Sequence, residues 1–158
     1  MEGNVTKRVE QDVPITREAI EAVLPQFRGT LQQVPPIYSA IRKNGKQLYK
    51  EARSGNLVSE EGLEARAVEI MDLELLQQHT NDGDASFDIA VECGGGTYVR
   101  ALIRDIGYAL DTVATTSALR RTQQGQFHVD AALSKEDWSP ETIYAEINRI
   151  NAERDASS

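Results

Sequence analysis

The chain has 158 residues, of which 40% are hydrophobic and 27% charged, and its formal net charge is −8 at pH 7. This length suits one domain with a hydrophobic core, and no apolar run reaches the roughly 18 residues of a membrane-spanning helix. Cys93 is the only cysteine, which excludes an intramolecular disulfide and indicates a reducing, intracellular compartment. His79 and His128 are the only histidines, so no metal-ligand cluster is visible.

The charge is distributed unevenly along the chain. Residues 56–92 hold ten acidic residues against the single base Arg66, whereas residues 41–55 hold five bases against Glu51. An acidic protein with one basic face can bind RNA, because local charge attracts phosphate more than net charge repels it. The alternative is an ordinary solvated helix surface.

The first helix is predicted at residues 15–24. Thr16 is suited to the N-cap position, and apolar residues then recur at helical spacing until Pro25 or Gly29 ends the helix.

A proline-fixed loop with a tyrosine follows. Pro35 and Pro36 restrict the backbone, so Tyr38 is expected on a stiff loop. A predicted helix over residues 46–54 comes next, and the bases of this region are Arg42, Lys43, Lys46, Lys50 and Arg53. The last three fall at i, i+4 and i+7, on one helical face. A ring beside a basic face suits stacking on a nucleic-acid base, and a tyrosine that anchors its loop to the core is the alternative.

Two strands are predicted in the middle of the chain. Residues 65–76 form one, and its inward side changes between Ile70 and Leu73, which indicates a bulge. A turn at residues 80–84 leads to the second, where Phe87 to Cys93 alternates between apolar and polar positions.

Three glycines, Gly94–Gly96, end the second strand, and a helix begins at Thr97 or Tyr98. Its apolar positions are Val99, Leu102, Ile103, Ile106 and Leu110. This pattern leaves Arg100 and Arg104 together on another face. Glycines beside a helix N-terminus favour an anionic ligand, and a tight strand-to-helix turn is the alternative. The segment matches neither the dinucleotide fingerprint nor the P-loop.

The C-terminal part contains two strand-like pieces around Gly125 and a last helix that begins at Ser139-Pro140. Residues 151–158 are expected to be frayed.

Three segments together resemble a known family. The Pro-Pro-Ile-Tyr38 segment, the Gly-Gly-Gly-Thr-Tyr98-Val-Arg segment, and Leu119-Arg-Arg-Thr with Gly125-Gln-Phe closely resemble the C-terminal half of the TruB- and Pus4-type tRNA pseudouridine synthases. The resemblance runs from about Gly3 to about Ala132. It implies an α/β (mixed, α+β-like) fold for residues 1–150, an incomplete catalytic domain with a mixed sheet flanked by helices, and no PUA domain.

The resemblance also implies roles for individual residues. Tyr38 corresponds to the tyrosine that stacks on the flipped-out uridine, and Tyr98 to the one packed beside the base and the catalytic carboxylate. Arg100 corresponds to the arginine that pairs with that carboxylate, and Leu119 to an apolar wall. The expected RNA contacts are Arg42, Lys43, Lys46, Lys50, Arg53, Arg120 and Arg121. The expected substrate is the T-arm loop of tRNA, at uridine 55, with no metal or organic cofactor.

The family's catalytic aspartate lies in a Gly-x-Leu-Asp-Pro-x-Ala motif, which is absent from the 158 residues. Leu110-Asp111-Thr112 is a superficial look-alike, but it follows the helix, where the family has only a turn. We therefore expect this chain to be a portion of a synthase that lacks the nucleophile and is inactive alone. The expected protein partner is the missing N-terminal portion of the same enzyme. The alternatives are a non-catalytic RNA-binding or RNA-chaperone module and a phosphate-ligand domain that uses only the glycine turn.

Overall fold

The computed structural model describes most of the protein, namely residues 7–10, 14–36, 42–43, 46–47, 63–81 and 84–156. Contacts divide the chain into two compact units, residues 1–117 and 118–158. The sequence predicted one domain up to residue 150. None of the described residues of the second unit is buried.

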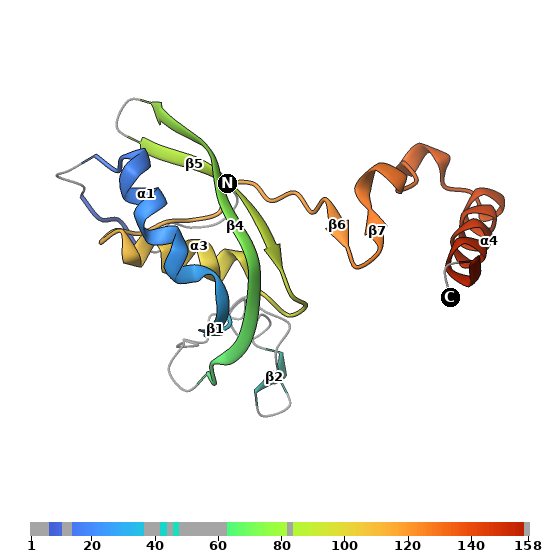
Figure 1. Ribbon diagram of the computed structural model, residues 1–158, viewed down its shortest axis with the longest axis horizontal. Coiled ribbons are helices and arrows are strands. Elements are labelled where there is room, and N and C mark those ends of the chain that lie inside the picture. The colour runs from blue at the N-terminus through green and yellow to red at the C-terminus, as the bar shows by residue number, and fades with distance from the viewer. Residues whose placement is uncertain are drawn as a thin grey trace. The chain divides into compact units, whose positions relative to one another are not determined.

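The first unit is built on a three-stranded sheet in the order β1-β4-β5 (Figure 1). The strands are β1 (Gly29–Gln33), β4 (Arg66–Asn81) and β5 (Asp84–Cys93). Strands with helices confirm the predicted α/β class. Every strand pair in the described part of the chain is antiparallel, whereas the resemblance implied a mixed sheet. Asn81 pairs with Asp84, and so short a connection permits only antiparallel pairing.

β4 changes its buried side along its length. Val68 and Ile70 are buried before the change, and Leu73 and Leu75 after it. The register with β5 shifts between Ile70 and Asp72, which confirms the predicted bulge. A second shift, between Leu75 and Gln77, was not predicted. The first bulge keeps apolar side chains on the core side of a strand whose sequence changes phase.

Helices cover one side of this sheet. They are α1 (Arg17–Val23), the 3-10 helix η1 (Leu24–Phe27) and α3 (Val99–Ala109), and α1 and α3 lie on the same side of β4 in Figure 1. The Thr16 side chain accepts a hydrogen bond of 3.2 Å from the Ala19 N–H, which confirms the predicted N-cap.

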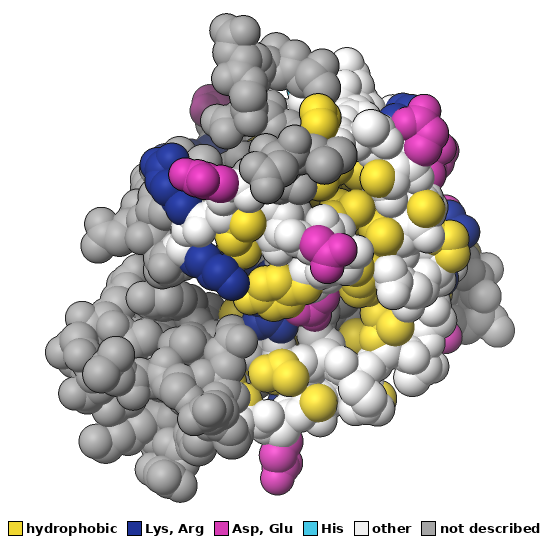
Figure 2. Space-filling view, turned by 90° about the vertical axis from the view of Figure 1, so that its left-hand side faces the viewer, with side chains coloured by type: hydrophobic (Ala, Val, Ile, Leu, Met, Phe, Trp, Pro, Cys, Tyr) yellow, Lys and Arg dark blue, Asp and Glu magenta, His cyan; other side chains and the backbone are white. Residues whose placement is uncertain are grey.

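The core joins both helices to β4. Its buried members are Ile20, Leu24, Ile70, Leu73, Leu75, Leu102 and Ile106. Partly buried apolar side chains surround them, and Figure 2 shows apolar side chains gathered in a band across the face in view. The first unit therefore has a small core with an apolar rim that reaches solvent.

Arginine side chains cover part of one edge of β4. β1 pairs only with residues 66–70. Beyond them, the Leu73 carbonyl accepts a hydrogen bond of 2.7 Å from Arg28, and the Leu75 carbonyl one of 3.4 Å from Arg17. These bonds attach the α1 and η1 region to the strand. They also occupy backbone acceptors that could otherwise pair with a strand of another chain.

A short hairpin replaces the start of one predicted helix. β2 (Arg42–Lys43) and β3 (Lys46–Gln47) are antiparallel, and Lys43 pairs with Lys46. The helix predicted from Lys46 is therefore wrong at its first two residues, and residues 48–54 lie outside the described part. Asn44-Gly45 stands between the paired segments, and this dipeptide is the strongest short-range hairpin signal. That signal outweighs the helical spacing of the bases.

The second unit contains a small hairpin and a long helix. Its elements are β6 (Gln123–Gln124), β7 (Phe127–His128), η2 (Val129–Ala131), η3 (Lys135–Asp137) and α4 (Pro140–Ala156). Gly125 has a φ of 56°, so the expected turn with its two strands is confirmed.

A reciprocal cap begins α4. The Thr142 N–H donates to the Ser139 hydroxyl oxygen at 3.1 Å, and the Ser139 N–H donates to the Thr142 hydroxyl oxygen at 3.0 Å. These bonds satisfy two backbone donors that the helix leaves free. They confirm the predicted helix start at Ser139-Pro140.

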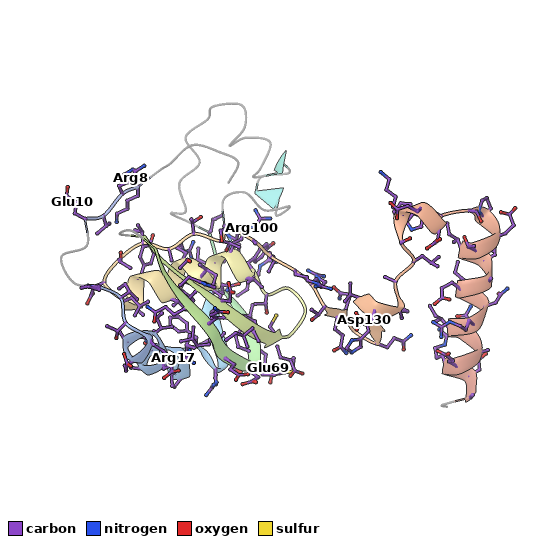
Figure 3. The ribbon with its side chains drawn as sticks, turned by 90° about the horizontal axis from the view of Figure 1, so that it is seen from above. Arg8, Glu10, Arg17, Glu69, Arg100 and Asp130 are labelled. Atoms are coloured by element: carbon purple, nitrogen blue, oxygen red, sulfur yellow. The ribbon has the colours of Figure 1, made fainter. Side chains whose placement is uncertain are left out.

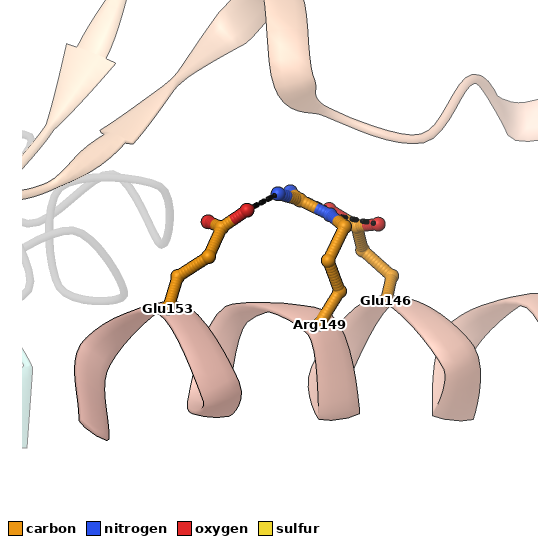
Figure 4. A network of polar contacts seen from close by, with 3 residues as sticks. All are labelled: Glu146, Arg149 and Glu153. Atoms are coloured by element: carbon orange, nitrogen blue, oxygen red, sulfur yellow. Dashed lines mark hydrogen bonds and ion pairs between the residues drawn. The ribbon is translucent and has the colours of Figure 1, made fainter. Parts of the chain in front are cut away.

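α4 continues to Ala156 and so includes residues 151–156, which the sequence placed in a frayed tail. Arg149 bridges Glu146 and Glu153, one turn away on either side (Figure 4). Pairs at this spacing favour the helix, and the second one reaches into the predicted tail.

The Arg149 guanidinium lowers the pKa of the Glu146 carboxyl from its ordinary value of 4.5 by hydrogen bonding to the carboxylate. A lowered folded-state pKa means that this bond favours the folded state above about pH 4.5, and that the effect is lost as the pH falls through the lower value. We predict that Arg149→Gln raises the pKa of Glu146, as measured by NMR titration of the side-chain carboxyl. Arg149→Lys, which keeps the charge but not the fork, should raise it less. Equal titration of Glu146 in all three proteins would contradict the bridge.

Gly107 lies in the last turn of α3, where a Cβ would come within 2.6 Å of the Ala114 backbone nitrogen. Alanine normally stabilises a helix by about 1 kcal/mol relative to glycine. We predict the opposite here, a loss of about 1–3 kcal/mol of unfolding free energy in Gly107→Ala, because the following segment must move. Urea unfolding measures the change. Gly95→Ala is the control, since nothing lies within 4 Å of that Cβ position. A Gly107→Ala protein as stable as wild type would contradict the close packing.

Candidate active site

One side chain joins the end of β1 to the start of α3. Gln33 is only 3% exposed and is the one buried polar side chain among the described residues. Its amide nitrogen donates to the Tyr98 carbonyl at 3.2 Å, and its amide oxygen accepts from the Tyr98 N–H at 2.8 Å. The Gln33 carboxamide therefore pairs with the Tyr98 backbone as a neighbouring strand would. Residues 65 apart in sequence are held together by this pair.

A second link supports the same junction. Arg104 donates to the Val34 carbonyl at 3.4 Å and to the Asp105 carboxylate at 2.9 Å. Val34 directly precedes the buried Pro35. The side chain of Gln33 and the carbonyl of Val34 are thus both bonded to residues at the start of α3 or within it. Arg100 and Arg104 lie four residues apart in α3 and so share one face of the helix, as predicted. The Arg104 side chain is only 20% exposed, and it is used in this link.

The glycine turn before α3 is fixed to the sheet. The Gly94 N–H donates to the Glu69 carbonyl at 2.8 Å, and the Thr97 hydroxyl donates to the Gly94 carbonyl at 2.9 Å. Gly96 has a φ of 87°, which favours glycine. Thr97 therefore closes the turn, and Tyr98 is the N-cap residue of α3. These contacts support the tight-turn interpretation and fix where the helix begins.

Tyr98 and Arg100 stand at the start of α3. Tyr98 is partly exposed, and Arg100 is exposed at the outer surface of the first unit (Figure 3). Among the described residues, the Arg100 guanidinium has no hydrogen-bond or ion-pair partner.

Charge separates the two sides of the first unit. The outer side of the sheet exposes the acidic residues Glu69, Asp72, Glu74, Asp88 and Glu92. Figure 3 shows Glu69 and Arg100 on opposite sides of the unit. These acidic side chains disfavour an anionic ligand on the sheet side.

The described structure does not test the places of the remaining predicted residues. Tyr38, Lys50 and Arg53 lie outside the described residues, and Arg42, Lys43 and Lys46 are described only as strand positions. Leu119, Arg120 and Arg121 are exposed in the second unit, where Arg121 donates to the Gln124 side chain. Their roles stay predictions.

Asp111 ends α3. Its φ of 55° is left-handed, and its N–H donates to the Tyr108 carbonyl at 3.1 Å. The Thr112 N–H donates to the Gly107 carbonyl at 2.9 Å. These two bonds form a Schellman motif, in which Asp111 occupies the position usually held by glycine. The geometry gives Asp111 a role in helix termination.

Gln33 was missed by the sequence interpretation, which predicted no strand at residues 29–33. A signal existed in the alternation of β1, where Leu31 and Gln33 share the inward side. A polar residue at an inward strand position needs a buried partner, and its partner is distant in sequence.

The described residues contain no cluster of three or more His, Cys, Asp or Glu side chains that could hold a metal ion. Among the helices of these same residues, none is long and apolar enough to cross a membrane.

A fold of this kind with this motif order is found in pseudouridine synthases. Residues 1–99 match the model of the TruB family pseudouridylate synthase (N terminal domain). The chain therefore belongs to the TruB family.

Relatives agree with this assignment. The chain is 45% identical over 135 residues to tRNA pseudouridine synthase B of Stutzerimonas stutzeri (strain A1501), covering 85% of this chain and 41% of the relative. It is 44% identical over 142 residues to the protein of the same name from Pseudomonas aeruginosa (strain UCBPP-PA14), covering 87% of this chain and 42% of that relative.

A solved structure is also similar. A chain in the crystal structure of a Cbf5-Nop10-Gar1 complex superposes with a TM-score of 0.56 at 28% identity, over 82% of this chain and 32% of that one. The chain thus spans about two fifths of the length of the curated relatives it matches.

The left-handed backbone of Asp111 gives a prediction that tests its role in helix termination. Asp111→Gly should unfold at an equal or higher urea concentration than wild type, because glycine adopts this conformation without strain. Asp111→Val should lose about 1–2 kcal/mol of unfolding free energy, since a β-branched residue is strained there. Asp111→Gly that is much less stable than Asp111→Val would contradict the motif.

Proposed function

We propose that this chain forms part of the active site of a tRNA pseudouridine synthase that acts on the T-arm loop, at uridine 55 by resemblance to the family. The observation that carries the proposal is the Gln33–Tyr98 pair. It places the entrance of the Pro-Pro-Ile-Tyr38 segment against the start of the Tyr98-Val-Arg100 segment. Family membership supports the same activity, and the names of the relatives point to tRNA as the substrate.

The reaction is an isomerisation. The bond between N1 of the base and C1′ of the ribose breaks, the base turns, and a bond forms between C5 and C1′. C5 then loses a proton and N1 carries one, so no oxidant, reductant or co-substrate is consumed. The base must leave its stack to react, and an aromatic face replaces part of the lost stacking energy.

We assign the residues in the way the resemblance implies. Tyr38 stacks on the extruded uridine, Tyr98 packs beside the base, and Leu119 supplies an apolar wall. Arg100 holds the catalytic carboxylate ionised through bidentate hydrogen bonds. The free, exposed guanidinium of Arg100 in the described structure supports this role.

The carboxylate itself comes from a Leu-Asp-Pro motif outside these 158 residues. RNA phosphates are bound by the bases at 42–53 and by Arg120 and Arg121. The acidic outer side of the sheet supports an approach from the side of Arg100.

A chimera tests the proposal. The part of the chain that matches the Stutzerimonas stutzeri relative over 135 residues replaces the corresponding part of that relative. By resemblance to the family, the rest of the relative supplies the Leu-Asp-Pro motif. Release of tritium from 5-tritiated uridine in a T-arm stem-loop measures the reaction. The chimera should release tritium, whereas the chain alone and a chimera with the motif's aspartate changed to asparagine should not.

The outcomes distinguish the proposal from its rival. A folded chimera without activity would overturn the proposal. If the chain alone nevertheless bound the stem-loop with a salt-dependent affinity, the non-catalytic RNA-binding module would be the better description. Tritium release by the chain alone, abolished by Asp111→Ala, would mean that the nucleophile lies within these residues.

Arg100 gives the sharpest single-residue prediction. In the chimera, Arg100→Lys should lower the single-turnover rate by at least about tenfold, because lysine keeps the charge but cannot bind a carboxylate with a planar fork. Affinity for the stem-loop should change little. Arg8→Lys, on another exposed arginine, is the control and should leave the rate unchanged. A rate within twofold of wild type for Arg100→Lys would remove Arg100 from the site.

A further inference from the structure

Gln33 is an unusual residue for the interior of this unit. A buried carboxamide lowers stability unless its donor and acceptor are both bonded, and an apolar residue at the same inward position carries no such cost. At 3% exposure, Gln33 directs both of its polar atoms to the backbone of Tyr98 alone. Both of its side-chain hydrogen bonds are therefore made to the backbone of a single residue.

The two bonds are not equivalent. The Tyr98 carbonyl already accepts from the N–H groups of Ala101 and Leu102, at 3.0 and 3.1 Å, as part of α3. The Tyr98 N–H precedes the helix and has the Gln33 oxygen as its partner within the described residues. Without Gln33 this N–H is left unpaired next to the core, and Tyr98 loses its link to the end of β1.

Only a few residues of the chain separate the Gln33–Tyr98 pair from the two segments of the proposed site. Tyr98 is itself a site residue, and Arg100 follows two residues later on the first turn of α3. On the other strand, Val34 and two prolines separate Gln33 from the segment that carries Tyr38. Prolines have a fixed φ, and Val34 is held by Arg104, so little backbone freedom intervenes up to Pro36.

We propose that Gln33 is a positioning residue for the isomerisation, which sets Tyr98 and Arg100 relative to the end of β1. This inference rests on the proposed function. Gln33 contacts no substrate in this role. It acts through the Tyr98 backbone, and its loss should affect turnover more than RNA binding.

Two variants test it. Gln33→Met has a similar length and fits an apolar environment, but it makes neither bond. Gln33→Asn keeps the carboxamide on a side chain one methylene shorter, which cannot keep both bonds to Tyr98. Gly107→Ala is the matched control for lost stability, because it disturbs α3 at its other end. All measurements are made well below the melting temperature of each protein.

The first readout is hydrogen exchange at the Tyr98 amide in the full chain, followed by NMR. Gln33→Met should exchange this proton on the order of tenfold faster than wild type, and Gly107→Ala should not. Unchanged exchange at Tyr98 would overturn the proposal, because the Gln33 side chain would then not be what holds this peptide.

The second readout is kinetic and uses the chimera with the T-arm stem-loop. Both Gln33 variants should lower kcat by roughly 10- to 100-fold, since small displacements of reacting groups have effects of this size. KM should stay within about threefold, and Gly107→Ala should keep kcat within twofold. A kcat within twofold of wild type in the Gln33 variants, or a decrease in kcat no larger than that of Gly107→Ala, would overturn the positioning role. The proposed function would be unaffected by that result.

If Gln33→Met does not fold, Gln33→Asn decides by the same criteria. An inactive chimera with Gln33 intact would overturn the proposed function and this inference together, so the two failures are distinguishable.

Discussion

The paired hydrogen bonds between the Gln33 side chain and the Tyr98 backbone are the interaction on which the arrangement of the first unit depends. They join the last residue of β1 to the residue that begins α3. Hydrophobic contact alone would bring this strand and helix together without fixing their relative position, because apolar packing is not directional. Two directed bonds to the N–H and the carbonyl of one residue favour a single arrangement.

β4 supplies the frame for this junction. β1 pairs with its first five residues, and the Glu69 carbonyl in the same stretch holds the glycine turn that leads into α3. The bulge after Ile70 then redirects the apolar side chains of β4 toward α1 and α3. The end of β1 and the glycine turn before α3 are therefore attached to one short stretch of a single strand, which brings Gln33 and Tyr98 together despite their distance in sequence.

Features that depend on neighbouring residues were predictable from the sequence. The Thr16 cap, the bulge after Ile70 and the Ser139 cap of α4 each follow from a local pattern with a local physical cause. Lys46 was placed wrongly because helical spacing of bases is a weaker signal than the Asn-Gly dipeptide before it. Gln33 was missed for a different reason, since no local pattern reveals a partner 65 residues away.

The site residues divide in the same way. Tyr98 and Arg100 were predicted from their motif, and the structure places Tyr98 beside the end of β1. Arg100 lies in the first turn of α3, where the helix dipole disfavours a cation, and that turn contains no acidic residue to compensate. Such a position is unfavourable in isolation and becomes favourable when a carboxylate arrives. An aspartate placed there would have its pKa lowered by both the guanidinium and the dipole, and it would stay ionised as a nucleophile must. The charge arrangement at the start of α3 is thus physically consistent with a site completed by a carboxylate from outside these residues.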